Sequence, residues 1–359
     1  MLNFLHLSYS YLHWRRPSGP PAAAPDGTTR TFISTPKGDL ELLCARPTGP
    51  AAAAADGAAA APPVVVFLHG GMGSAWVWHE YMRHLAGRGV TSYAVSARGH
   101  GASWHPSFAR MLFATTKRAL ADDFVAGIRA VQAREGGREV VLVGHSSGGG
   151  LSQLILSEGD VRVSGLALLG AVPGSGSLSV YVNWWFLDPW FTIRMMFHGL
   201  HSNSPLSHPF LVRRVFFSDD YPDEKLADFQ GRMNRYESFL WPCGMVFRFA
   251  DPKRVLRNIT GWGTGNRVLI MAGTEEKLMT RPVQEKAAET YRAAFSGLVR
   301  DAILEAKDEA VQDLPGEGGL DNAGHGVELA YVPGAGHHLQ NDTMWEIGAE
   351  KLLAFLRRL

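Results

Sequence analysis

The 359-residue sequence has little of what several classes of protein require. It contains only two cysteines, Cys44 and Cys243, which is too few for a disulfide framework or a thiolate metal site. Its 35 Lys and Arg balance 34 Asp and Glu, so the strongly basic character of a nucleic-acid-binding protein is missing. No apolar run reaches the roughly 20 residues of a transmembrane segment. We therefore expect a protein of a reducing, cytoplasmic compartment whose partner is a small molecule and not a nucleic acid.

Two terminal segments carry only weak targeting signals. Residues 1–14 are rich in Leu, Phe and Tyr but lack the basic start and continuous apolar core of a signal peptide. Contact of this segment with a membrane surface is a minor alternative. The C-terminal Arg357-Arg358-Leu359 resembles a peroxisomal address but lacks the small residue at its first position. Neither segment changes the expected cytoplasmic location.

What the sequence does contain is an alternation of strand and helix patterns. Continuous β-branched and apolar runs predict strands that are buried on both faces, and amphipathic runs between them predict helices. Such alternation indicates an α/β fold with a mostly parallel sheet, helices on both faces and ligands at the carboxyl ends of the strands. The predicted strands cover residues 30–33, 40–45, 64–68, 90–95, 140–143, 166–169, 268–271 and 329–332, and the predicted helices cover 76–86, 116–134, 151–156, 282–298 and 343–356.

The alternation stops after Pro173 and resumes at about residue 266. Between these points aromatic clusters such as Trp184-Trp185-Phe186 stand among Pro and Gly, which indicates a mostly helical insertion. We therefore predict four parts of the chain. They are a flexible N-terminal extension (1–28), the first part of a core domain (29–173), a helical cap or lid (174–265) and the second part of the core (266–359).

The segment Gly144-His145-Ser146-Ser147-Gly148 matches the Gly-x-Ser-x-Gly pattern of a nucleophile elbow. It follows a predicted buried strand and precedes a predicted helix, which is the context that the pattern needs. A sharp strand-to-helix turn requires small residues two positions either side of the nucleophile, because larger side chains would collide. The free N–H groups of the helix N-terminus favour developing negative charge. Ser146 is thus the predicted nucleophile.

A glycine-rich loop, His69-Gly70-Gly71-Met72-Gly73, follows the strand predicted at 64–68. It lacks the Lys followed by Ser or Thr of a phosphate-binding P-loop. In folds with a nucleophile elbow, a loop at this place supplies half of the oxyanion hole. The predicted oxyanion donors are the backbone N–H of Ser147 and that of Gly71 or Met72.

The base and the acid are expected late in the chain. Gly334-Ala335-Gly336-His337-His338 follows the last predicted strand, so this loop emerges at the same edge of the sheet as the elbow. His337 is the predicted base, with His338 as the alternative. The loop after strand 268–271 carries Glu276, the predicted acid that orients the imidazole, and Glu275 remains a competitor.

From about residue 64 onwards, the chain resembles the α/β-hydrolase superfamily, in the branch with a helical cap between the sixth and seventh core strands. The resemblance implies an eight-stranded, mostly parallel sheet and the order nucleophile, acid, base. Ser96 departs from it, since many relatives carry Asp there, and Glu276 replaces the commoner Asp. The resemblance rests on five motifs in the expected order, at residues 69–71, 96–103, 144–148, 273–276 and 334–337.

The expected function is hydrolysis of a carboxylic ester, lactone or thioester of a hydrophobic small molecule through an acyl-enzyme on Ser146, without cofactor or metal. Acyl transfer to an acceptor other than water and carbon–carbon bond hydrolysis use the same three residues and stay open. So does a non-catalytic ligand-binding protein on the same scaffold. The aromatic residues of the predicted cap would roof the substrate, although each taken singly is better explained as core of the cap: Trp184, Trp185, Phe186, Trp190, Phe191 and Phe197.

Overall fold

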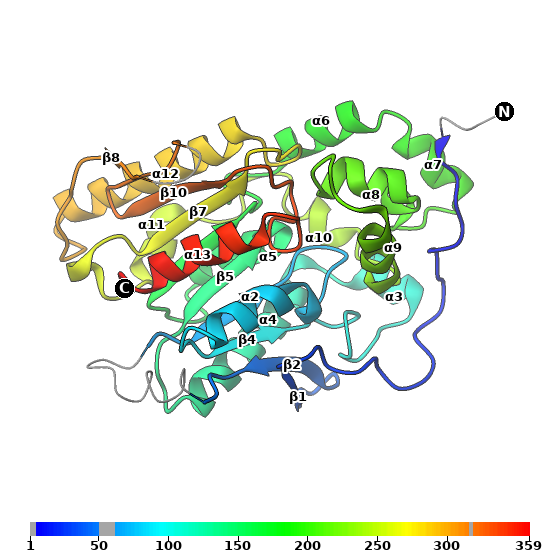
Figure 1. Ribbon diagram of the computed structural model, residues 1–359, viewed down its shortest axis with the longest axis horizontal. Helices are drawn as coiled ribbons and strands as arrows, with labels where there is room; N and C mark the ends of the chain where they lie inside the picture. The colour runs from blue at the N-terminus through cyan, green and yellow to red at the C-terminus, as the bar shows by residue number, and fades with distance from the viewer. Residues whose placement is uncertain (1–4, 50–61, 316–318) are drawn as a thin grey trace.

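The computed structural model describes residues 5–49, 62–315 and 319–359, and in them a single mixed sheet forms the centre of the molecule (Figure 1). The sheet has ten strands in the order β1-β2-β4-β3-β5-β6-β7-β10-β9-β8. The six strands from β4 to β10 in this order run parallel to one another, and the two outer strands on each side are added by antiparallel pairing. The strands are β1 (Thr29–Ile33), β2 (Leu40–Ala45), β3 (Val65–Leu68), β4 (Ser92–Val95), β5 (Val141–His145), β6 (Gly165–Leu169), β7 (Val268–Gly273), β8 (Gln312–Asp313), β9 (Asn322–Gly324) and β10 (Val327–Val332).

The sheet is wider than the eight strands that the sequence predicted. The two additional strands, β8 and β9, lie in the long stretch before β10, and β9 pairs antiparallel with β10 at the edge of the sheet. They are two and three residues long and carry no apolar alternation, which is why the sequence pattern did not reveal them. Their pairing covers an edge that β10 would otherwise leave open.

Two apolar cores lie on the two faces of the sheet. The strands are buried on both sides, and alternate residues serve different cores: Val65 and Phe67 of β3 face one, Val66 and Leu68 the other. The first core packs α2 (His79–Ala86) and α13 (Trp345–Leu356) against the sheet. The second packs the helices of the opposite face: α4 (Lys117–Arg134), α5 (Ser146–Glu158), α11 (Pro252–Arg257) and α12 (Arg281–Arg300).

Between β6 and β7 the chain forms helices and no strand, in agreement with the sequence pattern. Most of them lie together at one end of the molecule, beside α3 (Phe108–Ala114), whereas α11 packs against α5 and α12 (Figure 1). The division into core and cap at residues 174 and 265 stays a prediction. The helices are α6 (Leu178–Leu187), α7 (Phe191–Phe197), α8 (Pro209–Phe216), α9 (Asp223–Arg232), α10 (Leu240–Cys243) and α11, with 3₁₀ turns at Ser204–Leu206 and Trp262–Thr264.

Residues 5–28 run along the outside of this helical end and then along the sheet. The sequence predicted a flexible extension here. In the structure, however, Leu5 and Leu12 are buried, and the buried Arg194 side chain of α7 donates to the Leu5 carbonyl at 3.1 Å. His201 also contacts the His13 carbonyl at 3.0 Å. The stretch at residues 47–63 is rich in Ala, Pro and Gly, a composition that predicts a surface connection, and most of it lies outside the described residues.

Candidate active site

Ser146 stands at the junction of β5 and α5, where the chain reverses direction. Its φ is +53°, in the left-handed region that non-glycine residues rarely adopt. Glycine is required around it, because a Cβ on Gly148 would lie 2.2 Å from the His69 carbonyl oxygen. A Cβ on Gly70 would lie 2.8 Å from the Cβ of Ser146. Since α5 begins at Ser146, and not at residue 151 as the apolar pattern suggested, the serine lies in the first turn of the helix.

The structure brings Ser146, His337 and Glu276 together from three loops at the carboxyl end of the sheet. His337 Nε2 lies 3.0 Å from Ser146 Oγ, and His337 Nδ1 lies 2.7 Å from Glu276 Oε2. A carboxylate oxygen accepts hydrogen bonds, so Nδ1 donates its proton to Glu276 Oε2 and Nε2 is left to accept from the serine hydroxyl. His337 and Glu276 are both buried. This is the geometry of a nucleophile, a base and an orienting carboxylate.

Backbone groups fix the Glu276 carboxylate. Its second oxygen, Oε1, accepts the N–H groups of Leu278 and Met279 at 2.7 and 3.1 Å. Glu275, the competitor from the sequence, is exposed at the surface and its backbone N–H donates to the Ala335 carbonyl. The geometry therefore assigns the contact with His337 to Glu276.

The alternative base, His338, is directed elsewhere. It is buried against the Phe216, Phe217 and Phe229 rings, and its Nδ1 lies 3.1 Å from Asn341 Oδ1. Burial, together with repulsion from His337, lowers the pKa of His338 to about 3. A ring that stays neutral and does not contact Ser146 fits a structural role.

The loop after β3 lies beside Ser146, as predicted, but its two candidate donors already have acceptors. The Gly71 N–H donates to Ser147 Oγ at 2.8 Å, and the Met72 N–H donates to Glu237 Oε2 at 3.0 Å. Met72 has a φ of +64°, so this peptide is held in a strained conformation. Both N–H groups are thus hydrogen-bonded to side-chain oxygens in the structure.

Glu237, which no sequence motif indicated, comes from the segment between α9 and α10 and reaches the loop of Met72. Its Oε2 also contacts Nε2 of the buried His100 at 2.8 Å, while His100 Nδ1 lies 2.8 Å from the Arg98 carbonyl. Both ring nitrogens thus face oxygen acceptors, an arrangement that favours the doubly protonated imidazolium form of His100. Burial alone would lower the pKa of His100, but attraction to Glu237 outweighs it and the pKa is raised. The carboxylate of Glu237 near Ser146 thus has a buried histidine as its partner.

Ser96 departs from the family pattern, and the structure shows what replaces the missing carboxylate. Glu41 of β2 is buried, and its Oε2 accepts the Ser96 hydroxyl at 2.7 Å and the Ala102 N–H at 3.0 Å. Ser96 Oγ in turn accepts the Ala75 N–H at 2.9 Å. A carboxylate therefore still organises the turn of residues 96–103, but it comes from a neighbouring strand.

A cavity of about 660 Å³ opens above Ser146 and His337. Its floor includes the nucleophile and the loop of Gly71 and Met72, and its roof comes from the helices between β6 and β7. The lining is almost entirely apolar, and Glu237 is its one carboxylate among the described residues. The apolar side chains from α6 and α7 that line the cavity are Val180, Tyr181, Trp184, Phe191 and Met195.

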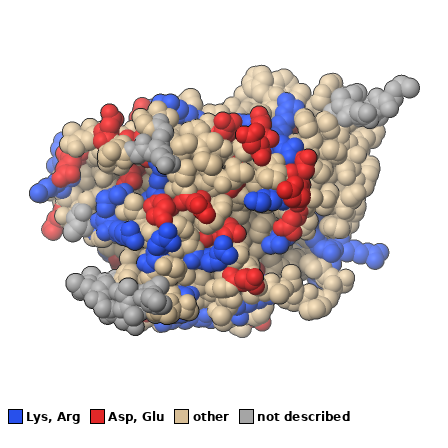
Figure 2. Space-filling model, viewed as in Figure 1, with Lys and Arg blue, Asp and Glu red and all other residues tan. Residues whose placement is uncertain are grey.

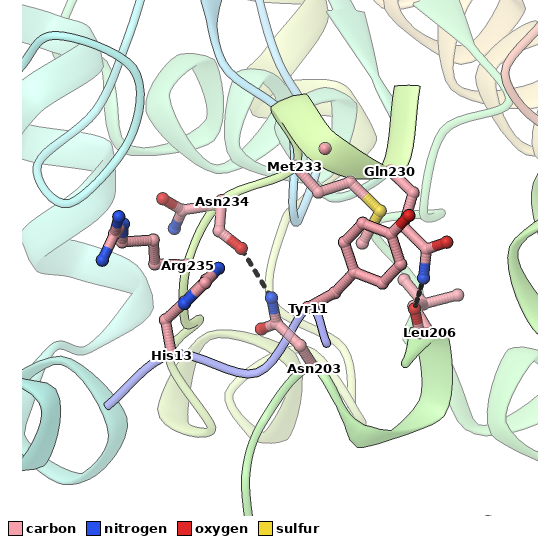
Figure 3. A pocket seen from close by; sticks show the side chains of 9 residues that line it. Tyr11, His13, Asn203, Leu206, Gln230, Met233, Asn234 and Arg235 are labelled. Carbon is pink, nitrogen blue, oxygen red and sulfur yellow. Dashed lines mark hydrogen bonds between the residues drawn. The ribbon is translucent and has the colours of Figure 1, made fainter. Parts of the chain in front are cut away.

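A second, smaller pocket of about 140 Å³ shares no lining residue with this cavity (Figure 3). Tyr11 and His13 of the N-terminal segment lie on one side of it, and Gln230 and Met233 at the end of α9 lie on the other. The amide groups near it are mostly used within the protein, since Asn203 Nδ2 donates to the Asn234 carbonyl and Gln230 Nε2 to that of Leu206. This pocket has no contact with Ser146.

In residues 5–49, 62–315 and 319–359, no group of three or more His, Cys, Asp or Glu side chains is placed to hold a metal ion. Across the same part of the chain, none of the helices combines the length and apolar character needed to traverse a lipid bilayer.

Comparison with known proteins places this geometry in a family. A non-heme haloperoxidase of Rhodococcus erythropolis is 34% identical over 110 residues, which cover 30% of this chain and 37% of that protein. The chain thus spans little more than a third of that curated relative. Two solved structures show the same fold, each over 92% of this chain. An esterase from Exiguobacterium antarcticum (17% identity, all of that chain, TM-score 0.59) is one. The other is a 2-hydroxy-6-oxo-6-phenylhexa-2,4-dienoate hydrolase from Rhodococcus (16% identity, 99% of that chain, TM-score 0.52).

The family model of the alpha/beta hydrolase family matches residues 65–346, a region that contains Ser146, Glu276 and His337. The sheet order, the turn at Ser146 and this match agree with one another. The chain belongs to the alpha/beta hydrolase family.

Proposed function

We propose that the protein is a serine hydrolase that cleaves a carboxylic ester, lactone or thioester of a hydrophobic small molecule. The observation that carries this proposal is the continuous hydrogen-bonded chain from Glu276 through His337 to Ser146 at the floor of an apolar cavity. A serine hydroxyl is a weak nucleophile unless a neighbouring base removes its proton. His337 has both the correct distance and the correct free nitrogen for this task.

In the proposed cycle, Ser146 Oγ attacks the acyl carbonyl carbon while His337 Nε2 takes the hydroxyl proton. The leaving alcohol or thiol receives that proton from His337, and an acyl-enzyme remains on Ser146. A water molecule then gives a proton to His337 and attacks the acyl carbon. As the bond to Ser146 Oγ breaks, His337 returns this proton to Oγ, which releases the acid and restores the serine and the neutral base. Glu276 holds the Nδ1–H of His337 throughout and stabilises the imidazolium.

The negative oxygen of each tetrahedral intermediate needs backbone donors. The Ser147 N–H at the start of α5 and the N–H groups of Gly71 and Met72 remain our proposed oxyanion donors. Ser147 Oγ accepts the Gly71 N–H and Glu237 Oε2 accepts the Met72 N–H. We therefore propose that the substrate oxygen displaces at least one of these side chains.

The cavity favours an uncharged, apolar substrate. A volume of about 660 Å³ lies within the range of small-molecule sites, and its mostly apolar lining offers few hydrogen-bonding groups to a highly polar ligand. The single carboxylate, Glu237, is already paired with the buried His100. We therefore propose a hydrophobic acyl or alcohol moiety.

The test combines covalent labelling with a substrate panel. A fluorophosphonate should label the folded protein at Ser146, as read by peptide mass, and should abolish hydrolysis of p-nitrophenyl esters of graded acyl length. Heat-denatured protein is the control and should not react. Failure of the folded protein to label would contradict the proposal and favour a ligand-binding protein. Labelling without ester hydrolysis would favour acyl transfer or carbon–carbon bond hydrolysis, which acyl acceptors and vinylogous diketones then separate.

A further inference from the structure

Helices α6 and α7 expose an unusual concentration of large apolar side chains. One side of each helix is exposed at helical spacing, at positions 178, 182, 185 and 186 of α6 and 193, 196 and 197 of α7, and the flanking positions 190 and 200 are exposed as well. The most exposed are Phe186 at 70% and Met196 at 68%. We call this the α6–α7 face; it consists of Leu178, Val182, Trp185, Phe186, Trp190, Ile193, Met196, Phe197 and Leu200.

The α6–α7 face carries no exposed charge. The only charged residues between positions 178 and 200 are Asp188 and Arg194, and these are buried and form an ion pair with each other. Burial, with repulsion from Arg194, lowers the pKa of His198 to about 4, so this ring is neutral near pH 7. In Figure 2, the end of the molecule that carries α6 and α7 is mostly tan, while charged side chains gather over other elements. The face therefore has no charged group that would lose its hydration when the face enters an apolar phase.

The same two helices are apolar on the inside as well. Tyr181, Trp184 and Phe191 line the cavity above Ser146, on the side opposite to the exposed residues. A helix that is apolar all round is normally buried on all sides, so the outer side lacks its partner. A single layer of helix therefore lies between the apolar cavity and the apolar outer surface.

Side chains that are typical of a membrane interface lie within the face and beside it. Tyr9, 55% exposed, donates its hydroxyl to the Phe197 carbonyl at 2.9 Å, and Trp185 and Trp190 lie within the face. On α8, which contacts α6, the Arg214 guanidinium lies 5.9 Å from the centre of the exposed Phe210 ring. Trp and Tyr rings and flanking cations are the side chains that favour the headgroup region of a bilayer with anionic lipids.

We propose that the α6–α7 face docks on the surface of a lipid bilayer and that the hydrophobic substrate enters the cavity from the lipid. A bilayer is favoured over a second copy of the chain because a substrate that fills an apolar cavity partitions into lipid, and the face lies directly outside that cavity. The docking itself needs no turnover, whereas the entry of substrate rests on the proposed function.

Vesicle flotation tests the docking. Wild-type protein is mixed with vesicles of phosphatidylcholine and phosphatidylglycerol, and the partition coefficient is compared with that of the triple variant Trp185→Ser/Phe186→Ser/Met196→Ser. We expect the triple variant to bind about 10-fold or more weakly, since three apolar side chains no longer leave water. The matched control replaces three exposed apolar residues elsewhere, Phe32→Ser/Ile303→Ser/Val311→Ser, and should bind like wild type.

Two further measurements keep the result decisive. Brominated lipids should quench the tryptophan fluorescence of the wild-type protein, which needs no variant. The inactive Ser146→Ala protein should float with the vesicles like wild type, so that failure of the proposed chemistry is told apart from failure of docking. Absence of both flotation and quenching in wild type would overturn the proposal. So would a wild-type dimer, seen by light scattering, that the triple variant loses, because a second copy would then cover the face.

Discussion

At the scale of single residues, the direction of each hydrogen bond decides what His337 can do. Glu276 Oε1 is committed to the two backbone N–H groups of Leu278 and Met279, so Oε2 alone faces His337 Nδ1. That arrangement leaves one tautomer of the imidazole, with its basic nitrogen towards Ser146. The carboxylate thus acts by orienting the base and by stabilising its charged form.

Replacing Glu276 by Gln keeps the shape of this site but reverses one hydrogen bond. The Gln oxygen would stay on the two backbone donors, and its NH₂ group would face His337 Nδ1. His337 would then carry its proton on Nε2 and could not accept from Ser146. We predict a fall in kcat of roughly 10³- to 10⁴-fold in an ester assay.

The matched control for this substitution is the adjacent residue. Glu275 is exposed and makes no side-chain contact with His337 in the structure, so Glu275→Gln should leave kcat within about twofold of wild type. Equal activity in Glu276→Gln and wild type would show that Glu276 does not orient the base.

At the scale of elements, the side chain of Glu237 attaches the segment between α9 and α10 to the core. Glu237 binds the Met72 N–H of the loop after β3 and His100 of the loop after β4. Both side chains are buried, so neither can regain full hydration if the other is removed. The contact therefore couples the roof of the cavity to the loop beside the nucleophile.

Glu237→Ala leaves His100 buried without its carboxylate and the Met72 N–H without its acceptor. We predict a loss of about 3–5 kcal/mol in the free energy of unfolding, measured by urea denaturation. His100→Gln in the Glu237→Ala background should add much less than it costs alone, since the partner charge is already gone. Additive losses in the double variant would mean that the two residues are not energetically coupled.

Element by element, the sequence predicted what depends on local chemistry. The turn at Ser146 needs Gly148 within two residues, and the loops that carry His337 and Glu276 follow strands whose apolar runs are continuous. These features depend only on residues that are close in the sequence. The order of the motifs therefore indicated the sheet and predicted that Ser146, Glu276 and His337 lie at one edge of it.

Contacts set by tertiary placement were not predictable in this way. Glu237 has no motif around it and reaches Met72 across 165 positions, and Glu41 replaces a carboxylate that the family pattern puts at Ser96. The strands β8 and β9 are too short and too polar to give a period. His100 stands in a motif, but its sequence neighbours do not show that its partner is a carboxylate.

For the whole molecule, histidine burial sets the response to acid. Ten of the fourteen histidines have a pKa below the ordinary value of 6.5, mainly because burial opposes their charge, and His100 alone is raised. In the unfolded chain these rings take up protons below pH 6.5, while the folded protein resists protonation. The unfolded state then binds more protons, so stability falls as the pH falls.

We predict that the urea midpoint of unfolding decreases as the pH is lowered from about 7.5 to about 5.5. This pH range lies above the ordinary titration of Asp and Glu. His338 is a large single contributor, because its pKa of about 3 keeps it neutral across the whole window. The pair of His100 with Glu237 acts in the opposite direction, since a raised pKa adds stability as His100 becomes protonated. A midpoint that stays constant or rises towards pH 5.5 would contradict this balance.

The central claim is that Ser146 is the nucleophile of an acyl-transferring site, and hydrolysis of p-nitrophenyl esters by wild type and Ser146→Ala tests it most directly. The account predicts measurable turnover by wild type that rises with acyl length into the apolar cavity. It predicts a loss in Ser146→Ala of up to roughly 10⁶-fold, the scale seen when such a nucleophile is removed. Equal turnover by both proteins, with the variant folded, would contradict the claim.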